Sequence, residues 1–236
     1  MNYYYITGTG SGLGKAIAEK LLENNDNIVF GLSRKKTVNH PNYHHFTVDL
    51  NENLKTFNFP EHSDALSINL INNAGILGPV KPVGKIDHQD LKLVIRVNLT
   101  APLILIDKFV RTYQGAKCKK VIVNISSGAA RYPFNSWMTY CASKAGLDMA
   151  SQVLATEQKD VKNKISVFSV APGIIDTPMQ EEIRKADPAD FPMLQMFRDY
   201  KEKEQLWPPE KTAEHIIRLC KNPEGFSDVL LDVRKM

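Results

Sequence analysis

Short apolar runs along this chain alternate with longer segments of helical periodicity. Strand candidates lie at about 2–7, 27–32, 43–49, 67–71, 120–126, 165–170 and 228–233. The first helical segment shows the pattern clearly, with Leu13, Ile17 and Leu21 on one face. Such an alternation predicts an α/β fold, a doubly wound parallel sheet of about seven strands with helices on both faces.

Length and composition fit one globular domain. The chain has 236 residues, 43% hydrophobic and 24% charged, which is enough to bury a substantial core. It contains no linker, internal repeat or low-complexity tract. We therefore predict a single domain over residues 1–236.

Targeting signals are not evident. The start Met1–Tyr5 lacks the basic and apolar regions of a signal peptide, and no apolar run approaches membrane-spanning length. We expect a cytoplasmic protein without a membrane partner. The three cysteines are far apart and odd in number, which favours reduced thiols: Cys118, Cys141 and Cys220.

The distribution of charged residues and histidines argues against two further classes of site. The formal net charge is +4, but basic residues are interleaved with acidic ones, unlike a nucleic-acid-binding arm. The six histidines, including His44 and His45, show no metal-ligand spacing with acids or cysteines. We predict no nucleic-acid partner and no metal site.

A glycine-rich segment follows the first strand candidate. Tyr3–Thr7 leads into Gly8-Thr9-Gly10-Ser11-Gly12-Leu13-Gly14 and then into the first helical pattern. Glycines let the backbone approach an anion, and the first amides of a helix face it. The order favours a phosphate-binding turn over a simple tight turn. Leu13 takes the third glycine's position of G-x-G-x-x-G, so the spacing is instead T-G-x-x-x-G-x-G.

Tyr140 and Lys144 are four residues apart, which on a helix places phenol and ammonium on one face. A cation ~4 Å away at an effective dielectric of ~20 contributes ~4 kcal/mol, or about three pKa units. That would bring the pKa of a phenol near neutrality. A solvated surface pair is the alternative for this spacing alone.

Several motifs together resemble the short-chain dehydrogenase/reductase family. They are Thr7 to Gly14, Asn72-Asn73-Ala74-Gly75, Asn98, Ser127, Tyr140, Lys144 and Pro172-Gly173. They span nearly the whole chain, and their order and spacing are specific. The chain also looks like the sepiapterin and benzil reductase branch, through its length, Leu32-Ser33-Arg34 and the stretch from Pro178 to Leu206.

The resemblance implies a Rossmann fold with cofactor and substrate sites in the same domain. It implies that Tyr140 gives a proton to a substrate carbonyl while a nicotinamide delivers hydride, that Lys144 lowers the phenol pKa, and that Ser127 polarises the carbonyl. Adjacent Ser126 is the weaker candidate. Asn98, in a helical stretch that we expect to break at Pro102, supports a proton relay in the family; a buried helix defect is the alternative.

The end of the second strand selects the dinucleotide, because a cation there attracts a ribose 2′-phosphate. Arg34 and Ser33 can bind that phosphate, with Lys35 and Lys36 as support, so we predict NADP(H). These cations could instead only solvate a loop. The resemblance implies further cofactor contacts at Gly8, Gly10, Ser11, Gly12, Leu13, Gly14, Asp49, Leu50, Asn73, Ala74, Gly75, Tyr140, Lys144, Pro172, Gly173, Ile175 and Thr177.

Two apolar, aromatic segments are candidates for the substrate pocket and lid. They are Tyr132–Met138 and Phe191–Phe197, from which we select Phe134, Trp137, Met193 and Phe197 beside Ser127. Each could equally fill the core or a subunit contact. Asp232 occupies the place of the acid that binds the pterin amino group in sepiapterin reductases, although structural acids are common there.

These features predict an NADPH-dependent carbonyl reductase that acts on an α-dicarbonyl or related ketone such as benzil. The alternatives are a sepiapterin-type pterin side-chain reductase, a 3-oxoacyl or sugar ketone reductase, and a non-catalytic NADP-binding sensor. Apolar helical patterns lie around 88–114 and 136–160, where family members often form dimers or tetramers, so we expect a homodimer or homotetramer. The alternative is that these apolar faces only cover the sheet.

Overall fold

One parallel sheet forms the centre of the computed structural model, which describes residues 1–52 and 54–236. Its strands are β1 (Asn2–Thr7), β2 (Asn27–Ser33), β3 (Tyr43–Thr47), β4 (Ser67–Asn72), β5 (Lys119–Ile125), β6 (Ser166–Ala171) and β7 (Leu230–Asp232). Their order is β3-β2-β1-β4-β5-β6-β7, and every neighbouring pair is parallel. The predicted sheet is confirmed, although β3 and β7 are shorter than expected.

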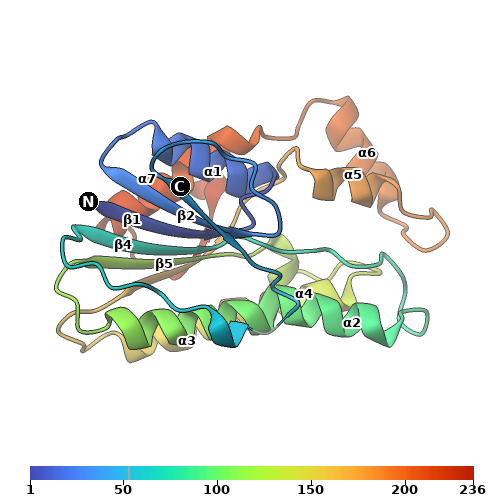
Figure 1. The fold of residues 1–236 in the computed structure, drawn as a ribbon. Coiled ribbons are helices and arrows are strands. Elements are labelled where there is room, and N and C mark those ends of the chain that lie inside the picture. The colour runs from blue at the N-terminus through green and yellow to red at the C-terminus, as the bar shows by residue number, and fades with distance from the viewer. Residues whose placement is uncertain (53) are drawn as a thin grey trace.

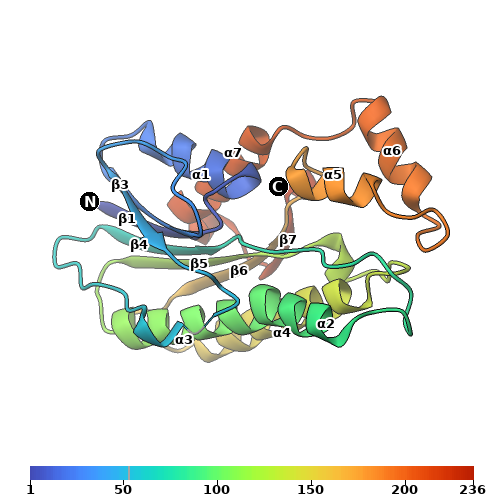
Figure 2. The ribbon, with the colours of Figure 1, turned by 45° about the vertical axis from the view of Figure 1, so that its right-hand side comes forward.

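Helices cover both faces of the sheet, as predicted (Figures 1 and 2). On one face lie α1 (Gly12–Leu22) and α7 (Pro209–Lys221); on the other lie α2 (His88–Ile95), α3 (Ala101–Tyr113) and α4 (Met138–Glu157). Ile17 and Ile216 are fully buried in the first layer, and Leu105 and Phe109 in the second. Two short helices, α5 (Pro178–Arg184) and α6 (Leu194–Glu202), stand beyond the strand ends.

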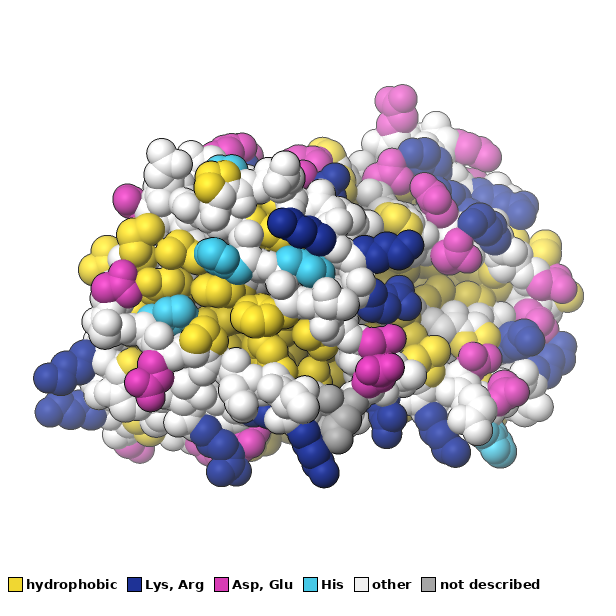
Figure 3. Space-filling view, in the orientation of Figure 1, with side chains coloured by type: hydrophobic (Ala, Val, Ile, Leu, Met, Phe, Trp, Pro, Cys, Tyr) yellow, Lys and Arg dark blue, Asp and Glu magenta, His cyan; other side chains and the backbone are white. Residues whose placement is uncertain are grey.

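The expected alternation of strands and helices fails at one edge of the sheet. Among the described residues no α-helix joins β2 to β3 or β3 to β4, and only the 3₁₀ turn Leu54–Thr56 interrupts the second connection. Phe57 and Phe59 from this coil are buried against the sheet instead. Figure 3 shows apolar side chains and histidines exposed together on the left of this face. Packing of aromatic side chains thus replaces a covering helix here.

The structure also bears on membrane-spanning helices and on disulfides. In the region that the structure describes, no helix has the length and apolar character needed to cross a bilayer. The three cysteines form no disulfide, in agreement with the prediction of free thiols.

Candidate active site

The predicted motifs meet at one edge of the sheet. The strands β1, β4, β5 and β6 are parallel and adjacent, so their carboxyl ends lie side by side. The glycine loop follows β1, Asn73–Gly75 follows β4, Ser126 and Ser127 follow β5, and Pro172–Gly173 follows β6. The sheet order also reverses direction between β1 and β4, which is where ligands bind in open parallel sheets.

The glycine loop brings α1 very close to β1. A Cβ placed on Gly14 would lie 2.4 Å from the Gly8 carbonyl oxygen and 2.3 Å from Nδ2 of Asn73. Gly8 and Gly12 have φ angles of 75° and 54°, in the left-handed region that favours glycine. Extended Ser11 precedes α1 without capping it through its side chain, and the first turn carries no acidic residue. The first-turn amides therefore face the strand edge without a capping group of their own.

The loop after β4 is fastened to the end of β1. The Thr7 hydroxyl oxygen accepts hydrogen bonds from the backbone N–H groups of Asn73 and Ala74, each at 3.0 Å. The Asn73 side chain donates to the Thr7 carbonyl at 2.9 Å. Glycine at position 75 leaves room for two functional groups, because a Cβ there would lie 3.4 Å from both Asn98 Oδ1 and Lys144 Nζ.

Asn98 holds the next residue of the same loop. Its Oδ1 accepts from the Ile76 N–H and its Nδ2 donates to the Ile76 carbonyl, both at 2.8 Å, while Nδ2 also contacts Ser143 Oγ at 3.2 Å. Asn98 is buried in a helix irregularity, as the alternative expects, but the expected hydrogen bond of its side chain to the helix's own backbone is wrong, because the amide bonds Ile76 instead.

The expected helix break at Pro102 is also wrong. The helical path continues from α2 through a π-helical segment, Arg96–Thr100, into α3, and Pro102 lies in the first turn of α3, where a proline is tolerated. Asn98 occupies the middle of the π segment. The α-helical hydrogen-bond pattern is therefore interrupted at this π-helical segment and not at the proline.

Tyr140, Lys144 and Ser127 come together beneath this loop. Tyr140 and Lys144 project from the first turns of α4 and are 7% and 3% exposed. The Lys144 ammonium donates to the Ile125 carbonyl at 2.8 Å and lies 5.8 Å from the centroid of the Tyr140 ring. The Ser127 hydroxyl, which accepts a hydrogen bond from the Ala129 N–H at 3.1 Å, is near enough to the Tyr140 phenol to lower its pKa. Ser126 is buried and its hydroxyl has no partner among the described residues, which supports Ser127 as the functional serine.

Electrostatics at this pair differ from the sequence expectation. Burial raises the pKa of the Tyr140 phenol, and the hydrogen bond from Ser127 opposes that rise. Burial also lowers the pKa of Lys144 to about 8, opposed by the negative charge of Asp148. Contrary to the expectation that Lys144 brings the phenol pKa toward neutrality, that pKa lies above its ordinary value, because burial disfavours the phenolate.

The segment after β6 reaches back to the glycine loop. Gly173 has a φ of 79°, and Ile175 forms a parallel bridge with Trp207. Extended Thr177 precedes α5, and its methyl carbon would lie 3.3 Å from a Cβ at Gly12. The predicted cofactor residues after β6 thus lie against the start of α1.

The candidate substrate residues gather in an aromatic cluster that includes Tyr140. Its buried members are Leu77, Ala129, Trp137, Tyr140, Ile183, Phe191, Leu194 and Phe197. The Trp137 ring lies 5.7 Å from that of Tyr140 and 4.9 Å from that of Phe134, and partly buried Met193 packs on the same cluster. Figure 3 shows a hollow with an apolar floor right of the centre, bordered by Lys and Arg side chains.

The comparisons with known proteins assign the family. The model described as short chain dehydrogenase matches residues 2–188. This chain is a short-chain dehydrogenase. It is 36% identical over 240 residues to a benzil reductase, (S)-benzoin forming, from Bacillus cereus, covering 95% of this chain and 96% of the relative.

Two further comparisons support the family and its branch. A sepiapterin reductase from Xenopus tropicalis is 36% identical over 154 residues, covering 64% of this short-chain dehydrogenase and 57% of the relative. A crystal structure of a short-chain dehydrogenase/reductase from Saccharomyces cerevisiae superposes with a TM-score of 0.82 at 26% identity, covering 99% and 96% of the two chains. Family, fold and resemblance to the sepiapterin and benzil reductase branch are thus confirmed.

In this short-chain dehydrogenase the end of β2 presents cations to the cofactor side. Arg34, Lys35 and Lys36 are exposed, whereas the Ser33 hydroxyl donates to the Lys35 carbonyl at 2.9 Å. The Thr37 hydroxyl donates to the Thr9 carbonyl at 3.1 Å, which ties this loop to the glycine loop. Arg34 is therefore the better of the two predicted phosphate ligands.

The end of β3 has two predicted adenine contacts. Asp49 accepts a hydrogen bond from the Asn51 N–H at 2.9 Å, and the Leu50 side chain is buried in the core.

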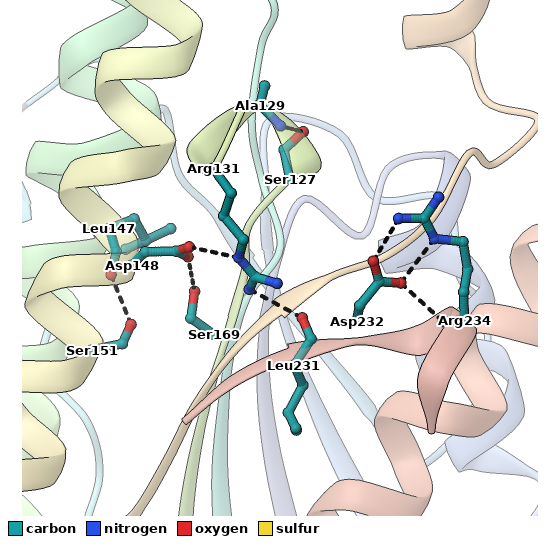
Figure 4. Close-up of polar contacts among 10 residues, drawn as sticks. All are labelled: Ser127, Ala129, Arg131, Leu147, Asp148, Ser151, Ser169, Leu231, Asp232 and Arg234. Atoms are coloured by element: carbon teal, nitrogen blue, oxygen red, sulfur yellow. Dashed lines mark hydrogen bonds and ion pairs between the residues drawn. The ribbon is translucent and has the colours of Figure 1, made fainter. Parts of the chain in front are cut away.

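Sequence reasoning left out two groups of residues. Phe191 lies in the candidate segment Phe191–Phe197 but was not selected from it, and the structure buries it fully beside Trp137 and Phe197 in the aromatic cluster. The second group joins Arg131, Asp148 and the end of β7 (Figure 4). Asp148 lies four residues after Lys144 on α4, a spacing visible in the sequence, whereas its partners become neighbours only through the fold.

Proposed function

We propose that this short-chain dehydrogenase is an NADPH-dependent carbonyl reductase that transfers hydride to an α-dicarbonyl ketone such as benzil, with Tyr140 as the proton donor. The observation that carries the proposal is the position of Tyr140, which is buried with Lys144 on α4, interacts with Ser127 and packs against an aromatic cluster. It lies beside the loops that follow β4 and β5, at the edge of the sheet where cofactors bind.

The chain's residues fit a dinucleotide at this edge. The close approach of α1 to β1 at Gly14 and the uncapped start of α1 provide a cradle for a pyrophosphate. The exposed guanidinium of Arg34 supports a 2′-phosphate, and Asn73–Gly75 and Gly173–Thr177 border the same cradle. When bound, reduced NADP supplies the hydride.

Tyr140 supplies the proton. Because burial raises the pKa of the phenol, Tyr140 stays protonated near neutral pH, as a proton donor must. Hydride addition to the carbonyl carbon and proton addition to its oxygen together convert C=O to CH–OH. The Ser127 hydroxyl, close to the phenol, orients and polarises the carbonyl oxygen. The buried Lys144 cation stabilises the phenolate that remains after the proton leaves.

The aromatic cluster favours a bulky aromatic ketone. Trp137 is surrounded by the rings of Phe134, Phe191 and Phe197, at 4.9, 5.6 and 5.4 Å between centroids. Aromatic side chains pair well with the phenyl rings of a ligand such as benzil. The similarity to a benzil reductase over nearly the full length of both chains supports this substrate class.

Pterin reduction is the second candidate function, and the structure supports it less well than reduction of an aromatic diketone. The carboxylate of Asp232 accepts hydrogen bonds from Arg234 Nε at 2.9 Å and Arg234 Nη2 at 2.5 Å. A pterin amino group would have to compete with this guanidinium. The similarity to a sepiapterin reductase also covers a smaller part of both chains.

The decisive test is steady-state oxidation of NADPH, with NADH alongside, using benzil, simpler 1,2-diketones, sepiapterin, a β-ketoacyl thioester and a keto sugar. We expect turnover of benzil with NADPH and its loss in Tyr140→Phe. Turnover confined to sepiapterin, the thioester or the sugar would replace the substrate class. NADPH binding without Tyr140-dependent turnover of any ketone would support the sensor instead.

A further inference from the structure

A buried carboxylate lies on the catalytic helix outside the predicted site. Asp148 is 5% exposed and accepts two hydrogen bonds: from Ser169 Oγ of β6 at 2.6 Å and from Arg131 Nε at 3.3 Å. Its side chain is 7% exposed and that of Arg131 is 27% exposed. Burial of a carboxylate is costly unless it is paired, so this contact is built into the packing of the site.

Arg131 connects this carboxylate to the turn that begins at Ser127. The 3₁₀ turn Gly128–Ala130 starts directly after Ser127 and ends at Arg131, whose N–H donates to the Gly128 carbonyl at 3.0 Å. The other end of Arg131 donates from Nη2 to the Leu231 carbonyl at 3.1 Å. Figure 4 shows Arg131 between Asp148 of α4 and Leu231 of β7, with Ser127 at the start of its turn.

The charge of the same carboxylate raises the pKa of Lys144. Asp148 lies one helical turn after Lys144, and its charge opposes the burial that lowers the Lys144 pKa. The other titratable groups around the pair are Tyr140 and Cys141 on α4, and Asp232 and Arg234 after Leu231; β6 contributes the neutral Ser169. Asp148 is thus the acid that contacts the Arg131 side chain, and its negative charge also favours the protonated form of Lys144.

We propose that Arg131 and Asp148 form a positioning pair that holds the Ser127 turn against α4 and ties both to β7. Neither residue is assigned contact with substrate or cofactor. Arg131 sets the orientation of the turn carrying Ser127, and Asp148 both anchors Arg131 and keeps Lys144 charged. The inference rests on the proposed roles of Ser127, Lys144 and Tyr140.

The test compares kcat, KM and the pH dependence of kcat for Asp148→Asn, Arg131→Met and Arg131→Lys. A small misplacement of a reacting group lowers the rate strongly, so we expect kcat to fall about tenfold in Asp148→Asn and Arg131→Met, with KM for NADPH unchanged. Arg131→Lys should recover part of the loss because it keeps a cation beside Asp148. Ser169→Ala keeps both charges and should lower kcat less.

The pH profile separates positioning and charge support from a purely structural role. We expect kcat to fall at alkaline pH as Lys144 loses its proton. Asp148→Asn removes the supporting anion and should move this limb to lower pH; Arg131→Met removes a cation and should move it to higher pH. Loss of packing alone would lower thermal stability without these opposite displacements.

The matched control is the exposed pair Arg111 and Asp107 on α3, for which Asp107→Asn and Arg111→Met should leave kcat and its pH profile unchanged. Full kcat and an unmoved pH profile in Asp148→Asn and Arg131→Met, with Tyr140→Phe inactive, would overturn the positioning pair but leave the proposed function intact. Full activity in Tyr140→Phe would instead overturn the proposed function. If Arg131→Met does not fold, Arg131→Lys and Ser169→Ala test the proposal in its place. Wild-type kcat and wild-type pH profiles in both variants would overturn it.

Discussion

The Gly8 carbonyl oxygen lies only 2.4 Å from the position that a Cβ on Gly14 would occupy. The contact joins the end of β1 to the first turn of α1. It allows the helix to start directly above the strand, so that its first amides face the carboxyl edge of the sheet.

Gly14→Ala is therefore expected to lower the free energy of unfolding by about 1–3 kcal/mol, because the added methyl forces α1 away from β1. Intrinsic helix propensity alone would favour alanine by about 1 kcal/mol. Thermal unfolding and NADPH titration measure both effects, and NADPH affinity should fall with stability. Gly115→Ala is the control, since a Cβ there meets nothing within 4 Å. A Gly14→Ala protein as stable as wild type would contradict the packing argument.

Tyr140→Phe should lower kcat by about 10²–10⁴-fold, the usual contribution of a positioned proton donor. The fold should persist, because Phe keeps the ring that packs against Trp137. Steady-state kinetics and thermal unfolding check the two statements. Tyr3→Phe, which removes a hydroxyl bonded to Asp64 at the amino end of β1, should leave the rate unchanged.

Lys144 gives a stability effect with a defined pH window. Its pKa is about 8 in the folded chain against an ordinary value of 10.5, so between these values the unfolded chain binds more protons. The Lys144 contribution to the free energy of unfolding should therefore rise with pH from 8 to 10, and over the full window this contribution is about 3 kcal/mol.

Lys144→Met should remove this rise and, at pH 7, unfold at a higher temperature than wild type while losing turnover. Removal of a buried cation explains the added stability. Thermal unfolding at several pH values measures the difference between the two proteins. Equal pH dependence in both would show that Lys144 does not carry the depressed pKa.

Arg34→Ala should raise KM for NADPH by about tenfold to a hundredfold, since a hydrogen bond between charged groups contributes about 1.5–3 kcal/mol. KM for NADH should stay the same, because NADH has no 2′-phosphate. Arg111→Ala, at an exposed position of α3, is the control for a lost surface cation. A wild-type protein that prefers NADH would refute the assignment to Arg34.

Phe197→Leu should raise KM for benzil about three- to tenfold, through the loss of aromatic pairing, and leave KM for butane-2,3-dione unchanged. Phe226→Leu, in the other core layer, provides the same chemical change away from the site. If both diketones respond equally to Phe197→Leu, the aromatic cluster does not select the substrate.

The sequence predicted much of the local order in this protein. Strand positions followed from apolar runs, and the glycine loop, Asn98, Ser127, Tyr140 and Lys144 followed from motif order. These signals are local, because each depends on residues within about one element and on the rule that parallel strands end at the same edge. The roles assigned to these residues stay predictions, as do NADP(H), the substrate, the single domain and the oligomer.

The tertiary structure alone decided the rest. It placed a π-helical segment at Arg96–Thr100 in place of the expected break at Pro102, and it joined Asn98 to Ile76. It also reversed the expected direction of the Tyr140 pKa and brought Arg131 to Asp148. Burial and contacts between distant segments determine these features, and both exist only once the chain has packed.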